Sequence, residues 1–405
     1  MDKPFIDTFI GMFPDVLFQK LLGIEFVEVA KDRAALSPVK TFRSGLPLRA
    51  IKTIRNPRLP DEAVNNMNKL FKSLLTPIAA GAMALTTTAF SADLPKRTLC
   101  VWDIVGRSGP VASQMEDYRL QAIKWGLDLE MKVYTDEKIA AEDLKSGACD
   151  AAAITGLRAR EFSSFTGTLD SIGAIPDEDL MKVVLQYLAD PKLAKLMISG
   201  EYEIAGILPG GAVYLFTNDR TIDTVAELAG KKFAAMDFDK AQAIVIESVG
   251  ASPVSVSLTN FGSMFNNGSV DIIGAPAIAY NALELYKGLG DKGAVVNFDI
   301  IQLTAQIVAR HNRFPEGFGQ SSRGYVWSQY GKAMDVVNAA EKSINPSYWL
   351  DLPDKDKEGY MEMFRQSRLT LRDQGIYDGK MLSFLSKMRC KKDPALAECT
   401  AEDRE

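Results

Sequence analysis

Four segments of this chain place glycine, charged or aromatic residues directly after a short apolar run, where a strand would end: 102–109, 155–160, 236–242 and 275–280. In the first segment, Gly106 and Gly109 precede a helical pattern, and glycines there let backbone N–H groups approach an anion. Trp102 and Tyr280 could stack on a ligand, with buried aromatic packing as the alternative. The candidates for ligand binding are Trp102, Asp103, Arg107, Thr155, Arg158, Asp237, Lys240, Pro276 and Tyr280.

The charged candidates suggest two kinds of solute. Arg158 could bind a carboxylate through two parallel hydrogen bonds, or it could instead form a surface ion pair with Glu161. Asp237 and Asp239 could hold an amine or another cation, although for Asp239 we prefer the N-cap of the helix that follows it. These residues predict a binding site, and the sequence does not name its solute.

Signatures of catalysis are missing from the sequence. The chain has no GxSxG, HExxH or P-loop spacing, and no paired carboxylates stand in a glycine-framed loop. His311 is the only histidine, and its polar neighbours predict a surface loop. Without a second histidine or a CxxC spacing, a zinc site is disfavoured too. We therefore expect no enzymatic activity, no metal and no cofactor.

These binding segments must be positioned by strands and helices that alternate along the chain. Apolar runs and helical spacing predict strand, helix, strand, helix, strand over 97–105, 110–125, 127–134, 136–146 and 150–154. The same order returns over 232–236, 239–249, 253–258, 260–267 and 270–274. Such alternation predicts parallel sheets covered by helices, and its repetition predicts two lobes of similar fold. The segments 147–150 and 268–271, each Gly-x-x-Asp, occupy equivalent places in the two half-repeats.

The remaining segments are expected to connect the two lobes. Strands are predicted over 170–176 and 202–217, around a long helix at 177–197, and another pair of strands over 292–308 could cross back. Mainly helical structure is predicted for the last hundred residues, over 329–344, 353–374 and 378–388. In open α/β sheets, ligands bind outside the carboxyl ends of the strands. Two hinged lobes would therefore bring the four candidate segments face to face in a cleft.

Residues 67–92 have the order of a secretory signal peptide. Met67 is followed by Lys69 and Lys72, then by twenty uncharged residues and a small-residue end around Ser91. An uncleaved anchor and a buried core helix are the alternatives. Residues 1–92 hold 12 basic and 8 acidic residues, whereas 93–405 hold 35 and 44. The acidic body argues against nucleic-acid binding. Residues 1–66 are interpreted as disordered or as a mis-assigned extension before Met67, with a small N-terminal domain as the alternative.

All four cysteines follow the predicted signal, and an even number in an exported protein predicts two disulfides. Four cysteines allow three pairings. Cys390 and Cys399 are close together in a polar tail, which favours a local bond and leaves Cys100 with Cys149. Four free buried thiols in a cytosolic protein are the alternative.

An export signal, two α/β lobes, crossing strands and a helical C-terminal region together resemble periplasmic solute-binding proteins. The long helices resemble those of TRAP-transporter receptors. The segments RTLCVWDIVGRSGPV, QAIKWGLDLEMKVYTDE, AAEDLKSGACDAAAITGLRAREFSSFTG and LYKGLGDKGAVVNF are similar to the AdeT-type solute-binding family, across nearly all of 97–390. Members of that family have been labelled as RND-type efflux components. Long coiled-coil heptads, which an efflux adaptor would need, do not occur in this sequence.

The resemblance implies a two-lobed periplasmic-binding-protein fold and an exported protein that captures a small organic solute, such as a carboxylate, for a membrane transporter. An accessory role in an RND-type efflux system is the alternative, and an enzyme is the third reading. TRAP receptors usually bind a carboxylate through an arginine on a second-lobe strand. The corresponding segment here, KKFAAMDF at 231–238, has no arginine, and Arg158 is the substitute. We expect a monomer. The predicted divisions are 1–66, signal 67–92, first lobe 93–210, second lobe 211–300, crossing strand and C-terminal helices 301–389, and tail 390–405.

Overall fold

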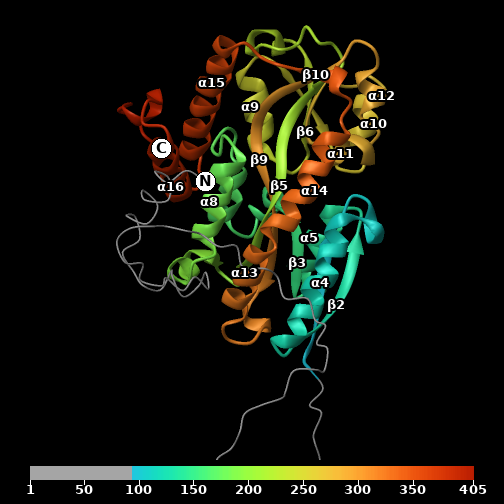
Figure 1. Cartoon of the computed structure of the whole chain (residues 1–405), viewed down its shortest axis with the longest axis vertical. Coiled ribbons are helices and arrows are strands. Elements are labelled where there is room, and N and C mark those ends of the chain that lie inside the picture. The colour runs from blue at the N-terminus through green and yellow to red at the C-terminus, as the bar shows by residue number, and fades with distance from the viewer. Residues whose placement is uncertain (1–93) are drawn as a thin grey trace, which may run out of the picture. The chain divides into compact units, whose positions relative to one another are not determined.

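A ten-stranded sheet is the framework of residues 94–405, which are the residues that the computed structural model describes. The predictions for 1–66 and 67–92 lie outside this range. The strand order is β2-β1-β3-β9-β5-β8-β6-β7, with β4 paired to β5 and β10 paired to β9 (Figure 1). The strands are β1 Lys96–Trp102, β2 Asp128–Tyr134, β3 Ala151–Thr155, β4 Ile198–Ser199, β5 Tyr202–Thr217, β6 Lys232–Met236, β7 Ser252–Val256, β8 Ile272–Pro276, β9 Ala294–Arg310 and β10 Trp349–Leu350.

Two parallel groups of strands form the two lobes. In the first lobe, β1 pairs in parallel with β2 and β3; in the second lobe, β6 pairs in parallel with β7 and β8. This arrangement confirms the predicted two-lobed α/β fold, because each βαβ crossover leaves its strands parallel with helices on the sheet faces.

The long strands β5 and β9 belong to both lobes. They pair with each other in an antiparallel manner over most of their length, and Figure 1 shows them running side by side from one lobe to the other. At one end β9 pairs with β3, and at the other β5 pairs with β8. The pair of strands predicted over 292–308 is therefore a single strand, β9. The predicted divisions at 210/211 and 300/301 fall inside these strands, because the chain crosses between the lobes without leaving the sheet.

The two Gly-x-x-Asp segments make the same hydrogen bonds to a neighbouring strand, one in each lobe. Asp150 N–H donates to the Thr98 carbonyl oxygen at 2.9 Å, while its Oδ2 accepts from Thr98 N–H at 2.9 Å. Asp271 repeats this pattern on Lys232, with distances of 2.8 and 2.9 Å. Each aspartate therefore closes the start of one strand onto its parallel neighbour. The repeated motif is explained by strand pairing and does not require a ligand.

Helices cover both faces of the sheet. Within residues 94–405, no helix combines the length and the hydropathy that a bilayer crossing requires. In the C-terminal region, α15 packs against α9 of the second lobe and α16 packs against α8 of the first. The helices are α4 Pro110–Lys124, α5 Glu137–Ser146, α6 Gly156–Ala159, α7 Ser164–Gly167, α8 Glu178–Leu188, α9 Lys240–Ser248, α10 Phe261–Asn266, α11 Ile278–Ala282, α12 Tyr286–Leu289, α13 Phe318–Ser328, α14 Tyr330–Ser343, α15 Asp354–Asp373 and α16 Gly379–Lys392.

The prediction of a strand over 170–176 is wrong. This segment begins at the end of a 3₁₀ turn, Thr168–Asp170, and continues as a buried loop. Two of its carbonyl groups accept from side chains, because Arg368 donates to Ile172 O and Arg389 to Ala174 O, at 3.0 and 2.7 Å. A single backbone bond, from Gly173 N–H to Ile300 O, joins the loop to β9. The apolar run reflects burial alone, since a buried loop and a buried strand have the same composition.

The long helix predicted over 177–197 is also shorter than expected. Helix α8 ends at Leu188, and a 3₁₀ helix occupies Pro191–Met197. Proline lacks the N–H group that the α-helical pattern needs, so Pro191 stops α8 and begins the tighter helix.

Candidate functional site

Four parallel strands of the two lobes direct their carboxyl ends toward a shared cleft. Strands β1 and β3 come from the first lobe, and β6 and β8 from the second. A first cavity of about 170 Å³ is lined by residues that follow each of these strands, and a second cavity has about 110 Å³. Residues that line both cavities are Trp102, Ile104, Thr155, Pro276, Ile278 and Leu303. The arrangement is the one that ligand binding at strand ends requires.

A close contact between the backbone at Gly156 and two side chains shapes the floor of the cleft. A Cβ atom on Gly156 would lie 2.3 Å from Thr304 Oγ1 and 2.5 Å from Asp170 Oδ1, so only glycine fits after β3. Thr304, on β9, donates from its hydroxyl to Asp170 Oδ1 at 2.6 Å and from its backbone N–H to Oδ2 at 3.1 Å. These bonds hold the fully buried Asp170 carboxyl at the crossing between the lobes.

Asp170→Asn is expected to remove a pH-dependent loss of stability. Burial raises the pKa of Asp170 from 3.8 to about 7, although the hydrogen bonds from Thr304 oppose this rise. Below about pH 4 the carboxyl is protonated in both states. Between about pH 4 and pH 7 the carboxyl releases its proton only in the unfolded state. The free energy of unfolding therefore falls as the pH rises, by a few kcal/mol over this range.

Urea denaturation of both proteins at a series of pH values checks this expectation. The free energy of unfolding of the wild type relative to Asp170→Asn should fall between pH 4 and 7 and then stay constant. A difference that does not change with pH would mean that Asp170 is ionised throughout the range.

Two arginines after β3 contact residues after β6 and so connect the lobes. The Arg158 guanidinium lies over the Phe238 ring, with its Cζ 3.4 Å from the ring centroid. Arg160 Nη1 donates to Asp239 Oδ1 at 3.0 Å, and both side chains of this pair are largely buried. Cation–π contacts and ion pairs of this kind gain strength when water is excluded. Together they hold the two sides of the cleft in contact.

Arg158 is engaged on the first-lobe side as well. Its Nη1 lies 3.2 Å from Glu161 Oε1, and its Nε lies 3.7 Å from Glu137 Oε2. The alternative considered for Arg158, an ion pair with Glu161, is therefore present in the structure. The pair is not at the surface, because the Arg158 side chain is 6% exposed.

Four of the nine predicted site residues line the cavities: Trp102, Asp103, Thr155 and Pro276. Asp103 lines only the second cavity, and both of its carboxylate oxygens are used by the protein. Oδ1 accepts from Val105 N–H and Oδ2 from Ala112 N–H, in the first turn of α4. A Cβ on Gly109 would lie 2.0 Å from Asp103 Oδ1, so the glycine before α4 makes room for this carboxylate.

The other five predicted residues line neither cavity: Arg107, Arg158, Asp237, Lys240 and Tyr280. Arg107, Asp237 and Lys240 are exposed, because the turns that carry them leave the strand ends toward solvent. Tyr280 is buried in the core of the second lobe, where its ring stacks on Phe216 with 6.5 Å between centroids. Hydrophobic packing, the alternative considered for this residue, accounts for its position.

Several cavity residues were not predicted from the sequence, chiefly Glu137, Asp170, Phe238 and Gln242. Glu137 was interpreted only as part of the helix after Asp136, yet it is fully buried and its Oε1 accepts from Thr155 N–H at 2.6 Å. Burial raises the pKa of its carboxyl. Phe238 lies between Asp237 and Asp239, and no local pattern marks it as a site residue. Asp239 caps α9, as preferred, through a bond from Ala241 N–H.

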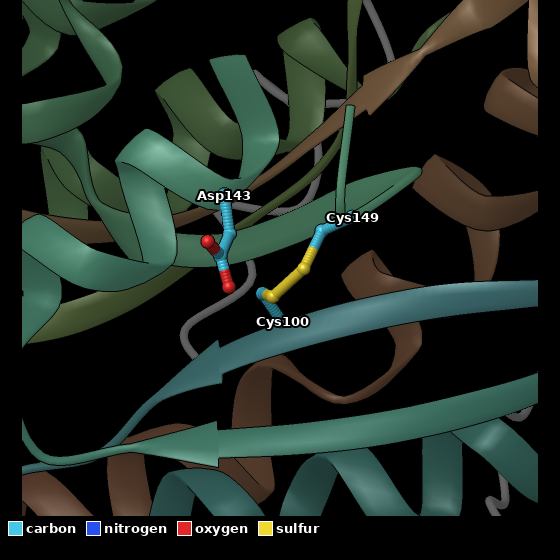
Figure 2. A group of neighbouring side chains, drawn as sticks. All are labelled: Cys100, Asp143 and Cys149. Carbon is cyan, nitrogen blue, oxygen red and sulfur yellow. A yellow bond between two sulfur atoms is a disulfide. The ribbon is translucent and has the colours of Figure 1, made fainter. Parts of the chain in front are cut away.

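Both predicted disulfides are present, Cys100–Cys149 and Cys390–Cys399. Figure 2 shows the first beside Asp143, and these three residues are the group of potential metal ligands found among residues 94–405. Both sulfur atoms are bonded to each other, so neither is the thiolate that a metal requires. Asp143 Oδ2 accepts a hydrogen bond of 2.6 Å from the Tyr134 hydroxyl. The group is therefore a covalent staple of the first-lobe core.

Two lobes joined by crossing strands, with cavities between the strand ends, define a solute-binding protein of the periplasmic type. Solved structures with this fold include a TRAP periplasmic solute-binding protein from Desulfovibrio salexigens with bound orotic acid, at 14% identity and a TM-score of 0.58, covering 73% of this chain and 99% of that one. Another is the sugar acid binding protein DctPAm from Advenella mimigardefordensis with galactonate, at 12% identity and a TM-score of 0.61, covering 74% and 99%.

The chain belongs to the solute-binding protein AdeT 1/2 family, which matches residues 122–404. The probable solute-binding protein AdeT1 of Acinetobacter baumannii is 45% identical over 303 residues, covering 75% of this chain and all of the relative. The probable solute-binding protein AdeT2 of the same organism is 28% identical over 233 residues, covering 58% and 98%. Family and fold together give the chain a periplasmic solute-binding role, and they imply binding rather than catalysis, with a small-molecule solute and a membrane transporter as partners.

Proposed function

We propose that this protein closes its two lobes on a small organic solute in the interlobe cleft and presents that solute to a membrane transporter. The observation that carries the proposal is the first cavity, which is lined from both lobes at the carboxyl ends of β1, β3, β6 and β8. The contacts of Arg158 with Phe238 and of Arg160 with Asp239 join the same two sides. If these contacts break, the two sides of the cleft can separate to admit a solute while β5 and β9 keep the lobes joined.

The residues proposed to contact the solute come from both lobes. Trp102 and Thr155 would contact it from the first lobe, and Phe238 and Pro276 from the second. The ring of Trp102 is half-buried, and its Nε1–H donates to Thr135 O at 3.2 Å, which fixes the orientation of the indole. An aromatic ring held in this way offers a rigid apolar surface to a ligand.

Export by residues 67–92 completes the proposal. The basic head and uncharged stretch of this segment support it, and the two disulfides of the body are typical of an oxidising compartment. N-terminal sequencing of the protein recovered from the periplasm should find Ala92 or Asp93 as the first residue. A first residue close to Asp2 would support an uncleaved anchor instead.

Thermal-shift screening of the periplasmic protein against organic acids, amines, aminoglycosides and neutral solutes tests the binding role. A solute present at 100 times its Kd adds about 2.7 kcal/mol to the free energy of unfolding and therefore raises Tm. A true cleft ligand should lose this effect when Pro276→Trp fills the cleft, whereas the same substitution should leave the Tm of the free protein similar. Failure of every solute class to raise Tm would overturn the proposed function.

A further inference from the structure

The lining of the cleft has an unusual balance of charge. Apolar side chains form most of the first cavity, among them Ile172, Val213, Leu215, Phe233 and Ile301. The ionisable carboxyl groups that line it are Glu137, Asp170 and Asp239, and those of the second cavity are Asp103 and Glu341. Among the described residues that line either cavity there is no lysine, arginine or histidine. The ionisable side chains that line either cavity are therefore all acidic, apart from tyrosine hydroxyl groups.

The two nearby arginines are already held by the protein. Arg158 is enclosed by Glu137, Glu161 and the Phe238 ring. Arg160 donates to Asp239 and to the Gly167 carbonyl oxygen, and its Cζ lies 5.0 Å from the Tyr377 ring centroid. Arg160 Nη2 and Arg158 Nε are buried without a hydrogen-bond partner among the described residues, and these two donors are the groups here that could favour an anion.

Two carboxyl groups of the first cavity keep an oxygen without a hydrogen bond. Glu137 is fully buried, and its Oε2 has no hydrogen-bond partner among the described residues. Asp239, which is 5% exposed, uses Oδ1 for both Ala241 N–H and Arg160, and no described residue donates to its Oδ2. By contrast, both oxygens of Asp170 accept from Thr304. Glu137 Oε2 is buried and lies 3.7 Å from Arg158 Nε, beyond hydrogen-bond distance, so a solute N–H group would supply the donor that it lacks. Asp239 Oδ2 is not among the buried unpaired atoms, and a solute N–H group would give that carboxylate a further partner.

We propose that the solute is a hydrophobic amine, whose ammonium group is bound by Glu137 and Asp239 while its hydrocarbon part lies against the apolar walls of the first cavity. This assignment rests on the proposed function of the cleft. An ammonium group satisfies acidic acceptors that a carboxylate would repel, and the walls favour hydrocarbon over polyhydroxylated solutes. The solute class would then differ from the orotic acid and galactonate bound by the similar solved structures.

Calorimetric titration of the mature protein purified from the periplasm tests the charge of the solute. Within each set the probes share one hydrocarbon skeleton and differ only in the head group: 2-phenylethylamine, 2-phenylethanol and 3-phenylpropionate form the aromatic set, and hexylamine, hexanol and heptanoate form the aliphatic set. We expect each amine to bind at least tenfold more tightly than its matched carboxylate. Tighter binding of the carboxylates would overturn the assignment but uphold the cleft. If none of the six probes binds, the assignment to a hydrophobic amine is wrong, whereas the proposed function is decided separately by the thermal-shift screen across all solute classes.

Two charge-neutralising variants locate the ammonium group. Asp239→Asn keeps a good N-cap for α9 and Glu137→Gln keeps an acceptor for Thr155 N–H, while each also removes the charge that faces Arg160 or Arg158. Each should weaken amine binding at least tenfold, the loss expected for one charge-assisted hydrogen bond. Asp136→Asn is the matched control, because Asp136 caps α5 in the same way and lines neither cavity. If Asp239→Asn instead tightens carboxylate binding and leaves amine binding unchanged, Arg160 is the binding group and the assignment is wrong.

Discussion

Replacing Cys100 and Cys149 together by alanine is expected to lower the free energy of unfolding by about 4 kcal/mol. The bond closes a loop with a sequence separation of 49 residues, and cross-linking so long a loop removes much conformational freedom from the unfolded chain. The loop contains β2, α5 and the helix between β1 and β2, which together make up much of the first lobe. Guanidinium denaturation of the oxidised proteins measures the difference.

The second disulfide provides the internal comparison. Cys390 and Cys399 are separated by 9 residues, so the same double replacement there should cost only about 2.5 kcal/mol. Under reducing conditions the wild type and each double variant should approach the same stability. A difference for Cys100 and Cys149 that persists in reductant would show that lost packing at these fully buried positions is the cause.

Arg389→Ala is expected to destabilise the protein by about 3 kcal/mol, because it removes one member of a buried ionic network. Arg389 on α16 is 3% exposed and donates to Glu398, to Glu405 and to the Ala174 carbonyl oxygen. Without it, two carboxylates lose a close cation and a buried carbonyl loses its donor. Thermal and urea denaturation of the variant give the size of the loss.

Lys391→Ala is the matched control for this substitution. Lys391 lies on the same helix, is exposed and forms no ion pair among residues 94–405, so its removal should change the free energy of unfolding by less than about 0.5 kcal/mol. The Arg389 variant should also loosen the loop that contains Ala174, which hydrogen exchange of that loop would detect. Equal stability of the two variants would contradict a structural role for the network.

The repeated α/β pattern shows how much of the fold could be predicted from the sequence. Strands, helices and glycine-terminated turns follow local rules of periodicity and backbone freedom, so β1, β2, β3 and their counterparts β6, β7 and β8 were expected close to where they lie. The pairing of Cys100 with Cys149 was expected too, because a local bond between the other two cysteines leaves one partner. The strands, the turns and the Cys390–Cys399 bond depend on residues close together in sequence, and the Cys100–Cys149 pairing then follows by elimination.

Failures of prediction occur where distant segments meet. The loop at 172–174 has the composition of a strand, but Arg368 and Arg389, about two hundred residues later, take the place of a neighbouring strand. No local pattern announces that exchange, because side-chain donors and strand donors satisfy a carbonyl group equally well.

The candidate site likewise has a part that local sequence predicts and a part that depends on contacts between distant segments. The sequence alone predicts that four segments at the strand ends form the site, because a parallel sheet brings those ends together whatever residues they carry. Only the tertiary structure decided which side chains face the cleft. In the structure, Arg158 lies over Phe238, Arg160 pairs with Asp239, and Glu137 and Asp170 are buried. Each of these arrangements depends on residues from separate elements. The charge offered to a solute is the sum of such long-range contacts, so it is set by the packing of the two lobes.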